Sequence, residues 1–214
     1  MFKNIVVVLI LLLSFSFGSA QNDWKLKTNK EGIKVYTRAA KDSKINIVKV
    51  ECEFTATLSQ FVAVIIDIKS SNRWQYKTDH FELIKQVSPT DYYYYAESEF
   101  PWPASNRDYV SHVTIKQNPQ TKKVFIDAVN VPDMVPLKSN KVRIVNSIGN
   151  WIISPINKNQ IGVEYILQVD PAGSLPAPVI NAFITAGPFE TFKKLKTQIN
   201  LPPYPSAVLP FIIN

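Results

Sequence analysis

Residues 170–200 read DPAGSLPAPVINAFITAGPFETFKKLKTQIN, and within this segment the apolar spacing changes to that of a helix. From Ile180 to Ile199, apolar side chains recur every three or four residues, and lysines fill much of the opposite face. This spacing predicts an amphipathic helix of about five to six turns. Pro188 lies inside it and predicts a kink near the preceding turn.

The chain before this helix has the pattern of an antiparallel sheet. Period-two alternation predicts strands that start at Ile33 and that cover 45–54, 81–87, 91–100, 109–117, 124–129, 142–153 and 160–169. The short turns between them favour antiparallel pairing. Helical segments are expected over 58–66 and 67–74, with a short N-terminal helix over Asp23–Leu26. This order predicts one α+β domain, a long curved antiparallel sheet with a long helix at its end.

Residues 1–20 have the pattern of a secretory signal peptide. Lys3 precedes an apolar run from Ile5 to Leu13, and small residues occupy positions 18–20. The apolar run is shorter than the roughly 20 residues that a membrane-spanning helix needs. We therefore expect cleavage after Ala20 and a secreted or periplasmic protein. An uncleaved N-terminal anchor is the alternative.

The composition excludes several kinds of site. The 214 residues include a single cysteine and two histidines, which argues against a disulfide framework, a Cys-rich zinc site and a His-rich metal centre. We expect no cofactor and no metal. Cys52 lies in an alternating apolar segment and is expected to be a buried core residue. The net charge is +7, but the basic residues are dispersed, and together with export this argues against a nucleic-acid partner.

Several segments, in order, resemble the START lipid-binding domain of the helix-grip (Bet v 1-like) fold. They are Trp24 with 32–38, Trp74, 103–110 (PASNRDYV), 149–151 (GNW) and 170–176 (DPAGSLP). Asn181 also stands where the family often has Asn. This sequence departs from the family in a longer gap before Arg107 and in Ala172, where the family has Gly. The resemblance implies a START-like domain over 21–200, followed by a Pro-rich tail over 201–214 that we expect to be loose.

The resemblance also implies a lipid-sized cavity between the sheet and the last helix, with that helix acting as a lid. Gly187-Pro188 would be the deformable point of the lid, and 132–136 a loop at the cavity rim. For each CH₂ group buried, a ligand would gain about 0.8 kcal/mol. Without the resemblance, the aromatic residues would be taken as core filling. The expected lining residues are Tyr94, Phe100, Trp102, Trp151, Tyr165, Phe183 and Phe192.

Arg107 and Asp108 come just before a strongly apolar strand, where one of the two side chains would face inward. A buried Arg107 needs a partner, and Glu97 or Glu99 on the preceding strand could provide it. Two interpretations stay open. The pair could clamp the polar head group of a ligand, or it could form a salt bridge that fixes the sheet.

We therefore expect a monomer that binds a lipid or another hydrophobic small molecule, with transport as an extension of that function. The lysines at 193, 194 and 196 are interpreted first as a solvated helix face, and transient contact with an anionic membrane surface is the alternative. No catalytic residue is expected. One alternative is a cyclase- or hydrolase-like enzyme on the same fold, with acid–base groups inside the cavity. The other is a module for a protein partner, with an exposed apolar patch around 132–136.

Overall fold

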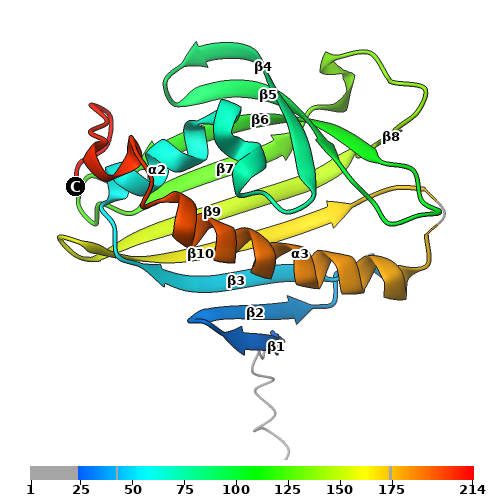
Figure 1. Cartoon of the computed structure of the whole chain (residues 1–214), viewed down its shortest axis with the longest axis horizontal. Coiled ribbons are helices and arrows are strands. Elements are labelled where there is room, and N and C mark those ends of the chain that lie inside the picture. The colour runs from blue at the N-terminus through cyan, green and yellow to red at the C-terminus, as the bar shows by residue number, and fades with distance from the viewer. Residues whose placement is uncertain (1–23, 42, 174) are drawn as a thin grey trace, which may run out of the picture.

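One long antiparallel sheet forms the framework of the computed structural model, which describes residues 24–41, 43–173 and 175–214 (Figure 1). The strand order is β1-β2-β3-β10-β9-β7-β6-β5-β4, and the short β8 pairs in parallel with β6. The strands are β1 (Lys25–Lys30), β2 (Ile33–Arg38), β3 (Ile47–Phe54), β4 (Thr78–Ser88), β5 (Asp91–Ser98), β6 (Arg107–Gln117), β7 (Val124–Asn130), β8 (Val142–Arg143), β9 (Asn146–Asn157) and β10 (Gln160–Asp170). The predicted α+β architecture is confirmed.

The helices lie against one face of this sheet. The helical segments are α2 (Leu58–Ile66), the 3₁₀ turn η1 (Ile68–Arg73), the short turns η2 (Pro132–Met134) and η3 (Tyr204–Ser206), and the long α3 (Ala177–Gln198). Thr57 starts α2 with a capping box, in which its hydroxyl accepts from the Gln60 N–H. The long helix α3 crosses the sheet and packs against β2 and β3 (Figure 1).

The core lies between these two layers and follows the alternation of the strands. In β3, Val48, Val50, Cys52 and Phe54 are all buried. Burial raises the pKa of the Cys52 thiol to about 11, which keeps it protonated at neutral pH. The prediction that Cys52 is a core residue is confirmed.

Two of the predicted elements are wrong. Lys25 and Leu26 belong to β1 rather than to an N-terminal helix, because pairing with β2 satisfies their backbone groups. Cation–π contacts also hold Trp24, since the Arg38 guanidinium lies 4.5 Å from its ring centre. The strand expected over 142–153 is divided into β8 and β9, since β8 leaves the β9 line to pair with the start of β6.

The C-terminal tail is docked, so the expectation of a loose segment is also wrong. Tyr204 and Ile212 are buried, and the Tyr204 hydroxyl donates to Asp67 Oδ2 at 2.8 Å. The Asn214 side chain accepts from the Ser59 N–H at 2.8 Å, at the start of α2. Prolines therefore stiffen a segment whose apolar residues still reach the core. The predicted signal peptide lies outside the described residues.

No helix in the described part of the chain is both long enough and apolar enough to cross a lipid bilayer.

Candidate ligand-binding cavity

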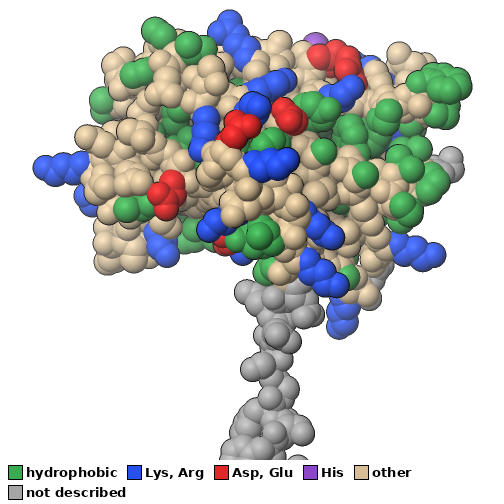
Figure 2. Space-filling model, turned by 60° about the horizontal axis from the view of Figure 1, so that its bottom comes forward, with side chains coloured by type: hydrophobic (Ala, Val, Ile, Leu, Met, Phe, Trp, Pro, Cys, Tyr) green, Lys and Arg blue, Asp and Glu red, His purple; other side chains and the backbone are tan. Residues whose placement is uncertain are grey.

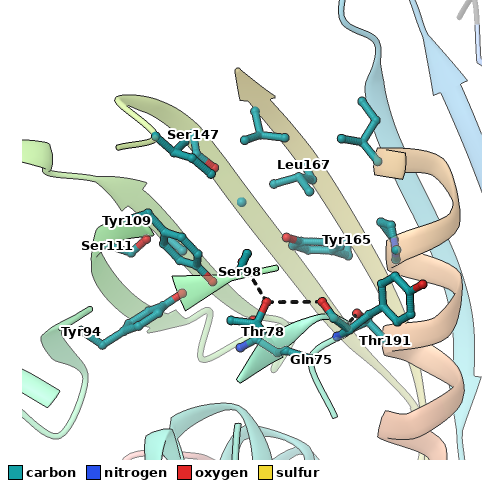
Figure 3. A pocket seen from close by; sticks show the side chains of 18 of the residues that line it. Gln75, Thr78, Tyr94, Ser98, Tyr109, Ser111, Ser147, Tyr165, Leu167 and Thr191 are labelled. Atoms are coloured by element: carbon teal, nitrogen blue, oxygen red, sulfur yellow. Dashed lines mark hydrogen bonds between the residues drawn. The ribbon is translucent and has the colours of Figure 1, made fainter. Parts of the chain in front are cut away.

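A cavity of about 220 Å³ lies between the sheet and the helices (Figure 3). Strands β4, β5, β6, β7, β9 and β10 provide one wall. The other is provided by α3, by the end of α2 and the start of η1, and by residues 74–76. From α3 come Phe183, Ile184, Gly187, Pro188 and Thr191. Gly187 and Thr191 are small and leave space on this face of the helix. Large side chains at these two positions would fill that space. The arrangement makes a largely apolar chamber that α3 covers along much of one side.

Five of the aromatic residues expected to line the cavity do so: Tyr94, Phe100, Trp151, Tyr165 and Phe183. Trp151 and Tyr165 face each other across β9 and β10, with ring centres 4.2 Å apart. Phe100 and Phe183 join the β5–β6 loop to α3, with ring centres 4.5 Å apart. That these side chains contact a ligand stays a prediction.

Trp102 and Phe192 do not line the cavity, and these two predictions are wrong. Trp102 is 92% exposed, because β5 ends at Ser98 and the strand alternation does not continue into the loop. Phe192 is fully buried and fills the core beside the cavity, against Phe54 and Trp151. Helical spacing identified the buried face of α3 but could not say which part of that face is hollow.

Arg107 is buried outside the cavity lining, and no carboxylate among the described residues pairs with it. Its guanidinium donates to the carbonyl oxygens of Pro171 at 3.1 Å, Ala172 at 3.0 Å and Ser105, and it lies over the Phe100 ring. Burial lowers the pKa of this guanidinium. Arg107 thus fastens the turn before α3 to the start of β6. Of the two interpretations left open, a salt bridge is formed by Asp108 with Arg143 and not by Arg107, and Arg107 does not line the cavity as a head-group clamp would.

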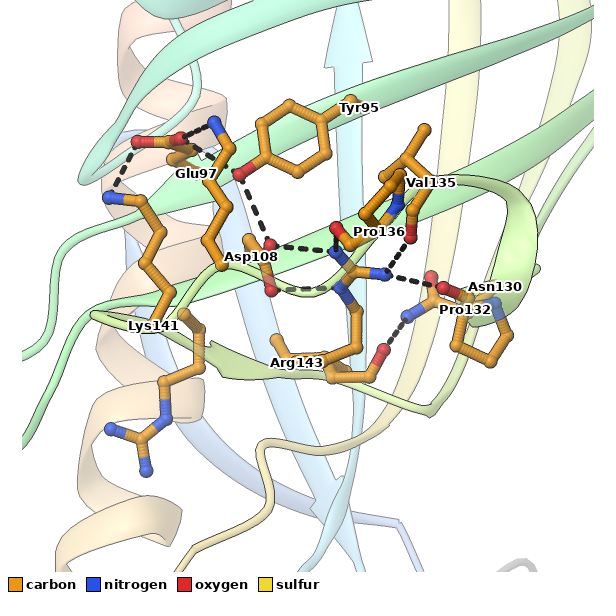
Figure 4. A network of polar contacts seen from close by, with 12 residues as sticks. Tyr95, Glu97, Asp108, Asn130, Pro132, Val135, Pro136, Lys141 and Arg143 are labelled. Carbon is orange, nitrogen blue, oxygen red and sulfur yellow. Dashed lines mark hydrogen bonds and ion pairs between the residues drawn. The ribbon is translucent and has the colours of Figure 1, made fainter.

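Glu97 points away from Arg107 and pairs with lysines of the β7–β8 loop. Its carboxylate lies 2.8 Å from Lys138 Nζ and 2.7 Å from Lys141 Nζ, and it accepts from the Tyr95 hydroxyl (Figure 4). Burial by itself would raise the pKa of Glu97, but these three donors hold it at about 2. The expected pairing of Glu97 with Arg107 is therefore wrong, and Glu97 does not line the cavity.

A second buried pair, Asp108 with Arg143, was not predicted. Arg143 Nε and Nη2 each lie 2.9 Å from an oxygen of Asp108, and both side chains are buried (Figure 4). The same guanidinium donates to the carbonyl oxygens of Pro132, Val135 and Pro136. A buried Asp108 signals that a cation must be near it, but the sequence does not say which one. This network holds the 132–136 loop on the sheet and restricts the apolar patch on which a protein-partner module would depend.

The polar side chains that do line the cavity are uncharged. Thr78 and Ser98 hydroxyls lie 3.0 Å apart, and the Ser111 hydroxyl donates to Asn130 Oδ1 at 3.0 Å. Burial raises the pKa of Tyr94, Tyr109 and Tyr165, so these hydroxyls stay protonated at neutral pH. Four of these polar lining residues were not predicted: Thr78, Ser98, Tyr109 and Ser111. The alternation of β5 and β6 around Tyr94 could have identified Ser98 and Ser111.

The acid–base residues on which the enzyme alternative depended lie elsewhere. Glu97, Glu99, Asp108 and His112 are all absent from the cavity lining. His112 Nε2 lies 2.8 Å from Asp91, and its ring stacks on Tyr93. Within 24–41, 43–173 and 175–214, no three His, Cys, Asp or Glu side chains cluster in a way that could hold a metal ion.

Comparison with known proteins gives consistent matches. The family model of the START domain matches residues 13–202. A STAR-related lipid transfer protein from Xanthomonas axonopodis is 31% identical, with a TM-score of 0.78 over 84% of this chain and 100% of that one. An uncharacterized protein from Pseudomonas aeruginosa is 28% identical over 90% of this chain and 96% of its own length.

Vertebrate relatives are more distant, and this chain spans only part of them. START domain-containing protein 10 of Mus musculus is 26% identical over 76% of this chain and 56% of its own length. Ceramide transfer protein of Xenopus laevis is 23% identical over 75% of this chain and 29% of its own length. Because the family model covers most of the sequence, the chain belongs to the START domain family, whose members bind and transfer lipids and other hydrophobic ligands.

Proposed function

We propose that this protein binds one hydrophobic molecule in the cavity beneath α3 and carries it through water. The observation that supports this most directly is a largely apolar chamber with α3 along one wall. Its volume of about 220 Å³ is below the roughly 300–1,000 Å³ typical of small-molecule pockets. A ligand of lipid size would therefore need this wall to move.

The first half of α3 is the part proposed to move. The second half of α3 is anchored by three buried side chains, those of Phe192, Leu195 and Gln198. In the first half the buried side chains are those of Ile180 and Ile184. Besides these two side chains, polar contacts hold the first half at its edges, at Asn181 and at the turn fastened by Arg107. Gly187-Pro188 lies between the halves, where Pro188 cannot donate the usual backbone hydrogen bond. Opening there would expose the cavity while the second half stays packed.

We propose that a membrane surface contacts the protein at the same end. Trp102 is 92% exposed, and Phe100 of the same loop packs against Phe183 of α3. Figure 1 shows this β5–β6 loop beside the start of α3, and Figure 2 shows basic side chains scattered over the displayed face. An exposed tryptophan favours the interface between water and lipid. Lys193 and Lys196 both contact Glu31, so Trp102 is the better anchor.

The decisive experiment is native mass spectrometry of the purified protein, followed by extraction and identification of bound molecules. We expect one hydrophobic molecule per chain, and transfer of a fluorescent lipid between vesicles that slows when Trp102 is replaced by Ala. Tyr93→Ala serves as a surface control outside the cavity. A protein that carries no ligand and takes up none from vesicles would contradict the proposed function.

Export and a monomeric state are further parts of the proposal. The pattern of residues 1–20 supports removal of a leader after Ala20. N-terminal sequencing of protein from the periplasm or medium is expected to begin at Gln21, and light scattering to give the mass of one chain. Full-length protein confined to the cytoplasm, or a stable dimer, would contradict these two points.

A further inference from the structure

The cavity wall in the described part of the chain contains no Asp, Glu, Lys, Arg or His side chain. Three charged residues next to lining positions in the sequence already have partners outside the cavity. The Arg107 guanidinium donates hydrogen bonds to three carbonyl oxygens. Glu97 forms ion pairs with two lysines, and Asp108 forms one with Arg143. An ionised group brought into the cavity would therefore meet no countercharge.

Neutral polar groups line both sides of the cavity, and more of them lie on the side of β4, β5 and β6. Figure 3 shows Tyr94, Tyr109, Ser111, Ser98 and Thr78 gathered on the side of β4, β5 and β6. A tyrosine, serine or threonine hydroxyl both donates and accepts hydrogen bonds, so this group can pair with hydroxyl, ester or amide functions.

The other side of the cavity carries fewer polar groups, namely the hydroxyls of Ser147, Tyr165 and Thr191, among apolar side chains. Trp151 and Leu167 from the sheet face it, together with Ile184 and Pro188 from α3. A ligand that matches both sides has a neutral polar end against β4–β6 and a hydrocarbon body against β9, β10 and α3.

Trp74 adds a donor without an acceptor. Its side chain is 2% exposed and lines the cavity, and its indole N–H has no hydrogen-bond partner among the described residues. Buried polar groups are nearly always paired in folded proteins, so an orphaned donor at a cavity wall indicates where an acceptor belongs. A carbonyl or hydroxyl oxygen of a ligand would satisfy it.

We infer that the cavity selects uncharged ligands whose polar end carries hydroxyl, ester or amide groups, and that it discriminates against the same hydrocarbon with an ionised head group. This inference rests on the proposed function, since it requires that the cavity is the binding site. The physical reason is the difference in desolvation. A neutral hydroxyl regains hydrogen bonds from the cavity wall, whereas an unpaired ion loses its hydration without compensation.

The test compares ligands with one sixteen-carbon chain and different head groups. Hexadecanol and 1-palmitoylglycerol are neutral, whereas palmitate and hexadecyl phosphate are ionised at pH 8. Dissociation constants are measured below the micelle concentration by tryptophan fluorescence, with calorimetry as a second readout. We expect the neutral pair to bind at least tenfold more tightly than the ionised pair. Palmitate should gain affinity as the pH falls and its carboxylate is protonated, whereas hexadecanol should not change.

Paired variants locate the polar end of the ligand. Tyr94→Phe and Tyr109→Phe each remove one cavity hydroxyl and should weaken 1-palmitoylglycerol three- to tenfold, the effect of one lost hydrogen bond. Tyr93→Phe is the matched control, because Tyr93 is the neighbour on the same strand and stacks on His112 outside the cavity. It should leave all four affinities unchanged.

The outcomes separate the two proposals. If ionised and neutral ligands bind equally well, or the ionised ones bind better, the inference about charge is overturned while the binding function stands. If none of the four binds and native mass spectrometry finds no hydrophobic ligand, both are overturned. Equal effects of the Tyr93 and Tyr94 variants would also contradict the assignment of the polar end to β4–β6.

Discussion

Ala172 has a φ of 55°, in the left-handed region that favours glycine. The family pattern has Gly at this position. The structure gives a reason for that preference, because this backbone conformation turns the Ala172 carbonyl toward Arg107 Nη2. A non-glycine residue pays about 1 kcal/mol or more for this conformation. We predict that Ala172→Gly raises the free energy of unfolding by about 0.5–1 kcal/mol in urea titrations, after the greater flexibility of the unfolded chain is subtracted.

The neighbouring glycine is the control for this prediction. Gly173 has a φ of 80°, and a Cβ there would lie 3.1 Å from Arg107 Nη2. Gly173→Ala should therefore destabilise the protein. If Ala172→Gly lowers stability, the strain assigned to Ala172 is contradicted.

Gly149 makes room for Tyr165 in the cavity wall. A Cβ at Gly149 would lie 3.3 Å from the Tyr165 hydroxyl oxygen, which is tighter than ordinary packing. We predict that Gly149→Ala displaces Tyr165 and lowers ligand affinity several-fold, with a stability loss of about 1 kcal/mol or less. Affinity is measured by titration, and the displacement by a crystal structure of the variant. Gly162→Ala is the matched control on β10, where the new Cβ would meet Ile156 at an ordinary 3.7 Å.

At the scale of single residues, local pattern predicted which face a side chain takes. Alternation identified Cys52 as a buried core residue, whereas the cavity lining by Tyr94 and Trp151 was implied by the family resemblance. Local pattern failed at Trp102, which lies in a loop without alternation, and at Arg143, whose partner Asp108 is 35 residues away. Which residues pair with a buried charge depends on which strands lie side by side, and a single sequence does not specify that arrangement.

At the scale of elements, Asn181 connects α3 to the segment before β3. Its side-chain oxygen accepts from the Asn46 N–H at 2.8 Å, and its side-chain nitrogen donates to the Lys44 carbonyl at 3.1 Å. We predict that Asn181→Ala loosens the first half of α3 and speeds ligand release about three- to tenfold, as expected for the loss of one or two hydrogen bonds. Stopped-flow measurement of release to excess acceptor vesicles gives the rate.

Lys193→Ala provides the comparison from the same helix. Lys193 lies 3.1 Å from Glu31, but both side chains are about half exposed, so this pair contributes little. Its loss should leave the release rate unchanged. Equal rates for the Asn181 variant and the wild type would show that the first half of α3 is not the moving part.

The elements themselves were mostly predictable, and the failures share a cause. α2 and α3 have strong helical spacing, and the sequence was sufficient for both. The Asp23–Leu26 helix was wrong because four residues give a helix little local stability, and an available strand edge satisfies the same backbone groups. β8 separates from β9 because it pairs with the start of β6, a contact that local pattern does not reveal.

At the scale of the whole molecule, β3 and β10 join the first three strands to the last six in the sheet order. Their pairing brings Val50 opposite Tyr165, so residues far apart in the chain form one continuous wall. The docked tail closes the α2 end through Tyr204 and Asn214. The sheet is therefore complete only once β10 is in place. The buried polar pairs at its edges hold the loops on it.

One of these attachments should appear in the pH dependence of folding. The pKa of Glu97 is about 2 in the folded protein and about 4.5 ordinarily, so its ion pairs with Lys138 and Lys141 stabilise the fold fully above pH 4.5. That stability is lost as the pH falls from about 4.5 toward 2, because the carboxylate is then protonated. We expect the loss to be about 1–2 kcal/mol, since solvent screens the exposed Lys138.

Glu97→Gln should remove this part of the acid dependence and should lower stability at pH 7 toward the acid value of the wild type. Urea titrations from pH 2.5 to 7 measure both effects. Glu82→Gln is the control, because Glu82 is exposed and its contact with His80 spans 3.9 Å. If the wild type and the Glu97 variant lose stability in parallel as the pH falls, the loop between β7 and β8 is held mainly by Arg143, whose contacts to three carbonyl oxygens do not titrate in this range.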